Sequence, residues 1–579
     1  MIAFAFYFGV YVCANAQEST MLQYQELTDP KPSNNNSWNN VKAGTHVSFA
    51  STDTRYHQNA APGSLSNTTN WKSKAWKGEK VHTQFLIYTT LHLENTRIEI
   101  GKLVHKNGQT IHPENIRTNY VRHVLTDELP PSGSGCGIPK GLDSFLVADI
   151  LDTVFSLPVS ANTTQAVWLS VDVPTNAVAG IYSGKLIIRN GKKVAGELDY
   201  AIEVLNRKLP EPPNWQFHLD LWQNPFSVAR MHNVKPWSQE HMDVMRPYMQ
   251  MLADAGQKVI TASIIHDPWN SQTLDVYRSM IRWVKKANGS WSYDYAHFDQ
   301  WVDYMHSMGI NKFINCYSMI PWNLKFYYYD EAAARDTFIV SAPGTPEYAA
   351  LWTPMLKDFV QHLKSKGWYE RTTIAMDERP LEAMQKAIKV IRDVDTGLKI
   401  SLAGNSHPEI QAELFDYCVA SNQKVDAATM AQRKEEGKTT TYYTCCVEAF
   451  PNTFTFSPPA ESTWLAWHAA NKGFDGYLRW AYNSWPKNPL ADSRYGSWSG
   501  GDTYLVYPGA RSSIRFERLI EGIQDYEKIR ILRNEYKKSN QTQTLNVLEA
   551  ALSGFEIGNL KTSSAADMLN KSKALLNQP

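Results

Sequence analysis

The pattern of apolar and polar residues divides the chain into two parts. From about residue 41 to residue 207, apolar and polar residues alternate in short runs that end at turn sequences such as Asn-Gly and Ala-Gly. An example is AVWLSVDVPTNAVAGIYSGKLIIRNGKKVAGELDYAIEVL. A period of two residues broken by such turns is typical of antiparallel strands. This part is therefore predicted to be an antiparallel β-sandwich.

Three prolines end the first pattern. Pro210, Pro212 and Pro213 lie close together in NRKLPEPPNW. Proline fixes φ and has no N–H to donate, so such a cluster interrupts both sheets and helices. We place a domain boundary here, with a sandwich domain over residues 17–209 and a second domain over residues 214–579.

The second part alternates apolar strands with amphipathic helices. Helical stretches such as PLEAMQKAIKVIRDV and AESTWLAWHAANKG separate the strands. Eight βα units in succession predict an α/β fold of the (β/α)8 barrel type, closed by further helices near the C-terminus. The eight strands are expected at residues 217–222, 258–264, 312–318, 372–376, 398–404, 416–421, 439–446 and 475–482.

Two adjacent carboxylates, Asp377 and Glu378, follow the fourth strand in the stretch TTIAMDERP. Reactive groups of such barrels project from the C-terminal ends of the strands. Neighbouring side chains of a strand point to opposite faces, so two of them share a pocket only where the pleat ends. We predict that this pair is catalytic. The alternative is that Asp377 pairs with Arg379 or caps the next helix, with Glu378 in its first turn.

The other strand ends supply aromatic, imidazole and amide side chains. Aromatic rings can stack on the C–H faces of a sugar while polar groups bind its hydroxyls, and the 19 tryptophans of the chain fit this interpretation. Trp269 and Trp322 also follow strands. The predicted substrate-binding residues are Trp222, His266, Tyr317, Asn405, Tyr443, Trp480, Asn483 and Trp485.

The composition and the missing motifs exclude other classes of function. With 58 Lys and Arg against 57 Asp and Glu and no long basic run, a nucleic-acid partner is not expected. The chain has no H-E-x-x-H, Gly-x-Ser-x-Gly, Gly-x-Gly-x-x-Gly or P-loop motif, so we expect neither a metal nor a nucleotide cofactor. No run beyond the N-terminus approaches the roughly 20 apolar residues of a membrane span.

The N-terminus and the cysteines bear on localisation. MIAFAFYFGVYVCANAQEST resembles a secretory signal peptide over residues 1–16, cleaved between Ala16 and Gln17, so the protein is expected to be secreted or periplasmic. Cys13 offers the alternative of a lipid tether. Five cysteines would remain, without Cys-x-x-Cys spacing. At least one should stay free, and we expect Cys445 and Cys446 to be reduced rather than joined to each other.

Three stretches carry a resemblance to a known family. AMDERP, GYLRWAYNSWPKNPLADSRYGSWSGGDTYLVYPG and SSIRFERLIEGIQDYEKIRIL, together with the order of sandwich, proline-rich junction and barrel, resemble glycoside hydrolase family 123, the exported N-acetyl-β-galactosaminidases. The resemblance implies hydrolysis of terminal β-linked N-acetylgalactosamine, with Asp377 and Glu378 matching the family's Asp-Glu pair. Family 20 hexosaminidases rank second, because Thr-Ile-Ala-Met replaces the His-x-Gly-Gly that usually precedes their pair.

The implied reaction is substrate-assisted and retains the anomeric configuration. The 2-acetamido oxygen of the sugar attacks C1, where other retaining enzymes use a carboxylate. Glu378 would protonate the leaving oxygen and later deprotonate water, and Asp377 would accept the acetamido N–H. The alternatives are a β-N-acetylglucosaminidase or hexosaminidase, another glycosidase, or a non-catalytic glycan-binding protein whose acids only accept hydrogen bonds from hydroxyls.

Overall fold

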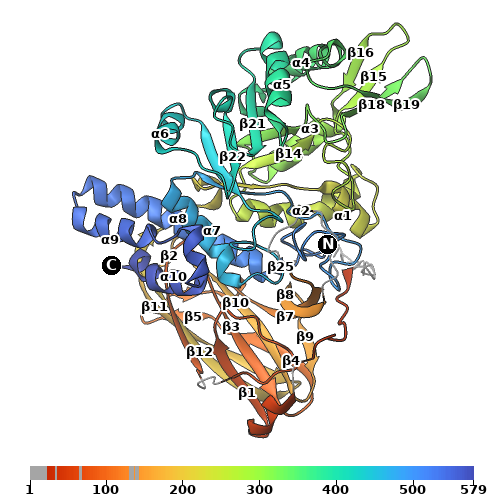
Figure 1. Cartoon of the computed structure of the whole chain (residues 1–579). Helices are drawn as coiled ribbons and strands as arrows, with labels where there is room; N and C mark the ends of the chain where they lie inside the picture. Colours follow the sequence, from red (N-terminus) through yellow and green to blue (C-terminus); the bar gives the residue numbers. More distant parts are fainter. Residues whose placement is uncertain (1–21, 33–34, 64–67, 130–135, 137–142, 579) are drawn as a thin grey trace, which may run out of the picture.

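The computed structural model describes residues 22–32, 35–63, 68–129, 136 and 143–578, so the predicted signal peptide lies outside the described residues. Figure 1 shows a β-sandwich formed by the N-terminal part of the chain, a mixed α/β region above it, and the C-terminal helices beside their junction.

The sandwich consists of two sheets. The first runs in the order β1 (Thr45–Ala50), β3 (Lys80–Thr89), β10 (Thr163–Asp172), β7 (Ile116–Thr126), β8 (Phe145–Asp152) and β25 (Ser512–Ser513). The second runs in the order β2 (Asn70–Lys77), β12 (Lys193–Lys208), β11 (Gly180–Asn190), β4 (Leu93–Ile100) and β9 (Ser156–Val159). In addition, β5 (Leu103–His105) pairs with β11, and β6 (Thr110–Ile111) pairs with β5.

Alternating side chains of the two sheets form one buried core. Phe85 and Leu169 of the first sheet pack with Leu186 and Ile202 of the second. The described pairings are antiparallel except that of β2 with β12, as the period of two residues predicts. The short strand β25 comes from the C-terminal region, so the first sheet is completed by residues far along the chain.

The α/β region is an eight-stranded parallel barrel, which confirms the predicted fold class. Every predicted strand overlaps an observed one, and the fourth has the predicted bounds. The strands follow the order β13 (His218–Leu221), β24 (Gly476–Arg479), β23 (Thr439–Tyr443), β22 (Asp416–Ala420), β21 (Lys399–Gly404), β20 (Thr372–Met376), β17 (Phe313–Tyr317) and β14 (Val259–Ser263).

The first and last strands of this order nearly close the barrel. The backbone N–H of Lys258 donates to the carbonyl of Leu219 at 3.0 Å. The side-chain oxygen of Gln257 accepts from the N–H of Leu221, also at 3.0 Å. A side chain thus replaces part of the missing ladder between β13 and β14.

Helices cover the outside of the barrel. In α5 the buried residues Met384, Ala387, Ile388 and Ile391 recur every three or four positions, so one face of the helix packs on the strands. The helices are α1 (Pro225–His232), α2 (Gln239–Asp254), α3 (Ala296–Ser307), α4 (Pro346–Lys366), α5 (Leu381–Val394), α6 (Ala427–Glu435), α7 (Pro459–Lys472) and α8 (Ile514–Lys538). Two further helices, α9 (Thr542–Leu552) and α10 (Ala565–Ser572), pack against α7 and α8 instead.

A small four-stranded sheet, which the sequence pattern did not lead us to expect, is inserted into the barrel. Its order is β16 (Trp291–Asp294), β15 (Arg282–Lys285), β18 (Lys325–Asp330) and β19 (Arg335–Val340). It projects at the upper right of Figure 1, beyond α3 and α4.

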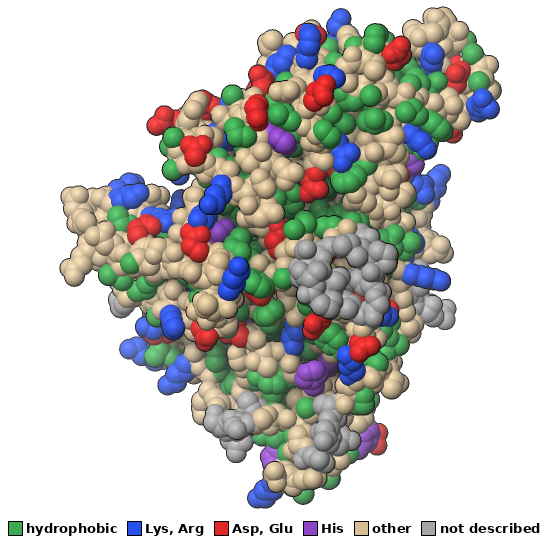
Figure 2. Space-filling view, in the orientation of Figure 1, with side chains coloured by type: hydrophobic (Ala, Val, Ile, Leu, Met, Phe, Trp, Pro, Cys, Tyr) green, Lys and Arg blue, Asp and Glu red, His purple; other side chains and the backbone are tan. Residues whose placement is uncertain are grey.

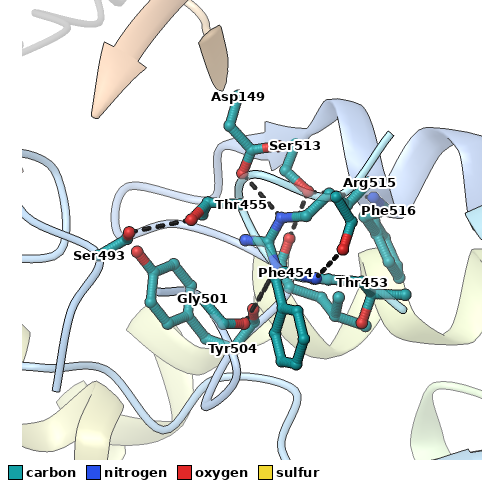
Figure 3. Close-up of polar contacts among 12 residues, drawn as sticks. Asp149, Thr453, Phe454, Thr455, Ser493, Gly501, Tyr504, Ser513, Arg515 and Phe516 are labelled. Atoms are coloured by element: carbon teal, nitrogen blue, oxygen red, sulfur yellow. Dashed lines mark hydrogen bonds and ion pairs between the residues drawn. The ribbon is translucent and has the colours of Figure 1, made fainter. Parts of the chain in front are cut away.

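A buried arginine joins the sandwich to the loops that follow β23 and β24 (Figure 3). The Nε of Arg515 donates to Oδ2 of Asp149, a residue of β8, at 2.9 Å. One terminal nitrogen of Arg515 donates to the carbonyls of Thr453, Gly501 and Tyr504. Leaving either charge of a buried ion pair without its partner costs several kcal/mol, about 3–5, so this contact holds the connected segments in one arrangement. The sandwich therefore anchors loops that reach the top of the barrel.

The surface carries both charge signs. Figure 2 shows acidic and basic side chains dispersed over the visible face without a broad patch of one sign. Among the described residues, no helix is long and apolar enough to cross a membrane.

Candidate active site

A pocket of about 130 Å³ lies at the C-terminal ends of the barrel strands and contains both predicted catalytic acids. Side chains from most of the strand ends and from one loop of the sandwich form its wall. They are Cys136, Trp222, Trp269, Gln272, Trp322, Asp377, Glu378, Ala403, Tyr443, Cys445, Cys446, Val447, Leu478, Trp480 and Trp498. Five indoles around two carboxylates suit a sugar ring, whose C–H faces are apolar and whose hydroxyls are not.

Asp377 is the buried member of the pair. Its Oδ2 accepts a 2.6 Å hydrogen bond from the indole N–H of Trp322. Its Oδ1 is buried and has no hydrogen-bond partner among the described residues. Burial raises the pKa of Asp377 to about 6, although the Trp322 hydrogen bond and the charge of Arg379 oppose the rise. Asp377 is thus mostly ionised at neutral pH, with one oxygen still able to accept a hydrogen bond.

Glu378 is the exposed member of the pair. Its Oε1 accepts a short hydrogen bond from the hydroxyl of Tyr443, which lies at the end of β23. Burial, and next the neighbouring Glu378, raise the pKa of Tyr443 well above its usual value, so this phenol stays protonated and remains a donor. Gly404, at the end of β21, leaves room for the Glu378 backbone, because a Cβ there would lie 3.3 Å from its Cα.

Neither alternative role of Asp377 describes this geometry fully. The Nε of Arg379 lies 3.8 Å from Oδ1 of Asp377, a loose ion pair, and donates instead to the carbonyl of Glu378 at 3.1 Å. Helix α5 begins after Pro380 without a side-chain cap, so Asp377 does not cap it. The guanidinium of Arg379 lies 3.9 Å from the centre of the Trp322 ring.

Aromatic side chains form two parts of the wall. Trp222 and Trp269 stack with ring centres 4.8 Å apart, and Tyr317 packs behind both. On the other part, Trp480 meets Trp498 edge to face at 5.7 Å. These rigid surfaces are available to sugar C–H groups without a large loss of side-chain entropy.

A buried ion pair positions Trp480. The indole N–H of Trp480 donates to Oδ1 of Asp502 at 3.3 Å. Asp502 in turn accepts from the fully buried Arg479 at 2.5 Å. The loop after β24 is therefore fixed at two residues, Trp480 and Asp502.

Three predicted binding residues, Trp222, Tyr443 and Trp480, line the pocket, and Tyr317 lies directly behind it with 1% of its surface exposed. His266 and Asn405 are not among the lining residues. His266 packs edge to face on Tyr327, with ring centres 4.9 Å apart, and Asn405 is exposed on the rim. The structure thus places these two outside the pocket wall.

Asn483 and Trp485 belong to the core, which corrects their predicted place in the binding surface. Both are fully buried. The amide of Asn483 exchanges two 2.9 Å hydrogen bonds with the backbone of Asn224, and the indole N–H of Trp485 donates to the carbonyl of Val506. The chain turns inward after Trp480, so neighbours in sequence face the core instead of the pocket.

A disulfide joins Cys136 to Cys446, which corrects the expectation that Cys446 is reduced. The free thiol of Cys445 also lines the pocket, and the three sulfurs lie within 4.8 Å of one another. With two of them bonded together, the group does not offer three thiolates to a metal. The bond links the sandwich to the rim of the pocket across 310 residues of sequence.

Sequence reasoning missed Gln272 and Trp498 as pocket residues. Trp498 lies in the long loop after β24, and its indole N–H donates to the carbonyl of Gln272 at 3.1 Å. Neither residue follows a strand directly, so the strand-end rule could not find them. The only signal for Trp498 was its place in the stretch that resembles family 123.

Comparisons with known proteins identify the family of both domains. The family model described as glycoside hydrolase 123, catalytic domain, matches residues 222–532, and that of the glycoside hydrolase 123 N-terminal domain matches residues 49–190. No curated protein matches the chain.

Among solved structures, a family 123 glycoside hydrolase from Clostridium perfringens is similar, with 25% identity and a TM-score of 0.82 over 92% of this chain and 98% of that one. The structure of that enzyme was determined to describe how it hydrolyses glycolipid glycans. A family 39 glycoside hydrolase from Bacteroides cellulosilyticus matches weakly, with 10% identity and a TM-score of 0.34 over 79% of this chain and 82% of that one.

Proposed function

The chain belongs to glycoside hydrolase family 123, and on this premise we propose that it removes terminal β-linked N-acetylgalactosamine from glycans by substrate-assisted retaining hydrolysis. The observation that carries the proposal is the different surroundings of two adjacent acids in one aromatic pocket. Asp377 is buried and held by an indole N–H, whereas Glu378 is exposed beside a phenol.

Asp377 suits the role of holding the acetamido group. Its Oδ1, which has no hydrogen-bond partner among the described residues, can accept the acetamido N–H, and this contact would turn the acetamido oxygen towards C1. Positive charge then develops on the acetamido group as its oxygen attacks C1, and the Asp377 carboxylate stabilises it. The Trp322 hydrogen bond fixes the carboxylate before the substrate arrives.

Glu378 suits proton transfer. Its exposed carboxyl can reach the glycosidic oxygen at the mouth of the pocket, protonate it as the bond breaks, and then take a proton from the water that attacks the intermediate. Before a substrate binds, Tyr443 donates to one oxygen of Glu378. During turnover the same phenol can donate to the acetamido oxygen when the substrate displaces Glu378.

The substrate class and the location of the enzyme are further parts of the proposal. The relative from Clostridium perfringens is linked to glycolipid glycans, so we propose glycolipid head groups as one source of the terminal sugar. We also propose that the protein is exported. The leader-like N-terminus supports export, as does the Cys136–Cys446 disulfide, because disulfides persist in oxidising compartments.

A panel of aryl β-glycosides tests the proposal. The purified protein should release phenol from the N-acetyl-β-galactosaminide at least about tenfold faster than from the N-acetyl-β-glucosaminide, a difference of about 1.4 kcal/mol in transition-state stabilisation. It should release none from the β-glucoside, which lacks the acetamido group. Comparable rates on both acetamido sugars would favour a general hexosaminidase, and no release from any substrate would favour a glycan-binding protein.

A further inference from the structure

A second hollow adjoins the active-site pocket at Trp322. It has a volume of about 310 Å³, and Trp322 lines both hollows. Its other walls come from the loops that flank β18 and β19 and from the first turns of α5. We call it the α5 groove, lined by Ile320, Trp322, Leu324, Ala342, Pro343, Arg379, Pro380, Glu382, Ala383 and Lys386.

The α5 groove borders the acid pair, where a leaving group could extend from the pocket. Glu378 has to reach the glycosidic oxygen, so the sugar beyond that oxygen must leave the pocket on the Glu378 side. Arg379 and Pro380, the next two residues, line the α5 groove. A glycan whose terminal sugar occupies the pocket can therefore place its second residue here.

Arg379 gives the groove a fixed positive charge. Its Nε is bonded to the carbonyl of Glu378, and its plane is held against Trp322. Within the described residues, the hydrogen bonds of this side chain involve Nε alone, so the two terminal nitrogens keep donors for a ligand. Paired N–H donors of this kind match a carboxylate.

Lys386 adds a second cation. Its stem packs against Gly344, where a Cβ would lie 2.5 Å from the Lys386 Cδ, next to Ala342 and Pro343 of the groove wall. Its ammonium pairs with Glu382 at 2.7 Å, but both groups are exposed, and such a pair contributes little. A ligand carboxylate can therefore replace Glu382 as its partner at small cost.

We propose that the α5 groove binds the sugar residue directly linked to the departing N-acetylgalactosamine, and that it favours a residue with a carboxylate, such as a uronic acid. This inference rests on the proposed function, because it needs a terminal sugar in the pocket. Arg379 and Lys386 line the groove with one acid, Glu382, while Asp377 lies behind Arg379 in a loose 3.8 Å ion pair. The start of α5, which has no side-chain cap, adds partial positive charge to the same wall.

Three substrates with the same terminal sugar test this inference. They are β-N-acetylgalactosaminyl fluoride, which has no leaving sugar, and two disaccharides in which N-acetylgalactosamine is β-1,4-linked to glucuronic acid or to glucose. The wild-type kcat/KM should be higher for the acidic disaccharide. Lys386→Met should lower that value about three- to fivefold, as expected for one partly exposed charge contact. It should leave the neutral disaccharide and the fluoride unchanged.

Two further variants sharpen the result. Lys389→Met removes a lysine of the same helix that pairs with Asp393 outside the groove, and it should change nothing. Ala383→Phe fills the groove and should slow both disaccharides but not the fluoride. The inference is overturned if the two disaccharides react alike in the wild type, if Lys386→Met and Lys389→Met behave alike, or if Ala383→Phe slows the fluoride equally. A wild type inactive on all three substrates would instead refute the proposed function, and this inference with it.

Discussion

The indole N–H of Trp322 donates a 2.6 Å hydrogen bond to Oδ2 of Asp377. This contact joins the loop after β17 to the acid after β20, two segments separated by 55 residues of sequence. It also stabilises the charged form of a carboxyl whose burial favours the neutral form. The protonation state of the site thus depends on a tryptophan outside the acid pair.

Replacing Trp322 by Phe should shift the pH dependence of the enzyme. The pKa of Asp377 is about 6, so kcat/KM should fall as the pH drops through 6 and the carboxylate is lost. Without the indole donor the pKa should rise by about 1–2 units, the equivalent of one hydrogen bond to a charged group. The acidic limb of the kcat/KM profile should therefore move to higher pH. Trp480→Phe is the control, because the indole N–H of Trp480 donates to Asp502 and not to Asp377, so this variant should leave the acidic limb in place. If Trp322→Phe also left the limb in place, the assignment of this limb to Asp377 would be wrong.

The two acids should differ in leaving-group dependence. Glu378→Gln should slow substrates with poor leaving groups by about 10²–10⁴-fold and largely spare the first step for an activated aryl group, which needs little protonation. Asp377→Asn should slow both kinds of substrate alike, because attack by the acetamido group is impaired whatever leaves. Steady-state and pre-steady-state rates on both kinds of substrate measure the difference. Equal losses in the two variants would exclude this division of roles.

Tyr443→Phe should lower kcat/KM by about 10- to 100-fold, the loss expected for one hydrogen bond to a charged group. The phenol is the described donor to Glu378, and its raised pKa keeps it protonated. Tyr442→Phe is the matched control, because Tyr442 is the preceding residue of β23 and donates to the carbonyl of Leu465 in the core. That variant should lose some stability and no activity. Similar activity losses in both variants would point to damage of β23 instead.

Alanine substitutions of Trp480 and Trp485 should have different effects, the first on activity and the second on stability. Trp480→Ala should lower kcat/KM more than about threefold, since its ring lines the pocket. Trp485→Ala should lower the free energy of unfolding by about 3–5 kcal/mol, since its ring is fully buried. Denaturant unfolding and kinetics of both variants provide the test. A catalytic defect in folded Trp485→Ala equal to that of Trp480→Ala would contradict the core position of Trp485.

Cys136→Ser should lower the free energy of unfolding by about 2–5 kcal/mol, because the disulfide with Cys446 closes a very long loop in the unfolded chain. A reductant should lower the melting temperature of the wild type towards that of the variant and leave the variant unchanged. Alkylation and intact mass give a second measure, since Cys136 and Cys446 should react only after reduction. Reaction of every cysteine without reductant would rule out the disulfide.

The sequence predicted the barrel because the signals for its strands are local. Apolar runs such as TTIAM and LKISLAG predict buried strands whatever the rest of the fold is. The amphipathic period of PLEAMQKAIKVIRDV predicts a helix with one face packed on the protein. Once the strands are counted, the parallel topology places Asp377 and Glu378 at the common end of the barrel. The position of the acid pair was therefore predictable from sequence.

The neighbours of the acids were only partly predictable. Trp480 and Trp485 follow the same strand within five residues, yet one lines the pocket and the other lies in the core. Cys446 bonds to a residue 310 positions away, and Trp498 reaches the pocket from a long loop. The direction of a side chain in a loop depends on contacts with distant segments, such as those that Arg515 makes with Asp149. Periodicity carries no information about such contacts, so the tertiary structure alone decided which strand-end residues form the site.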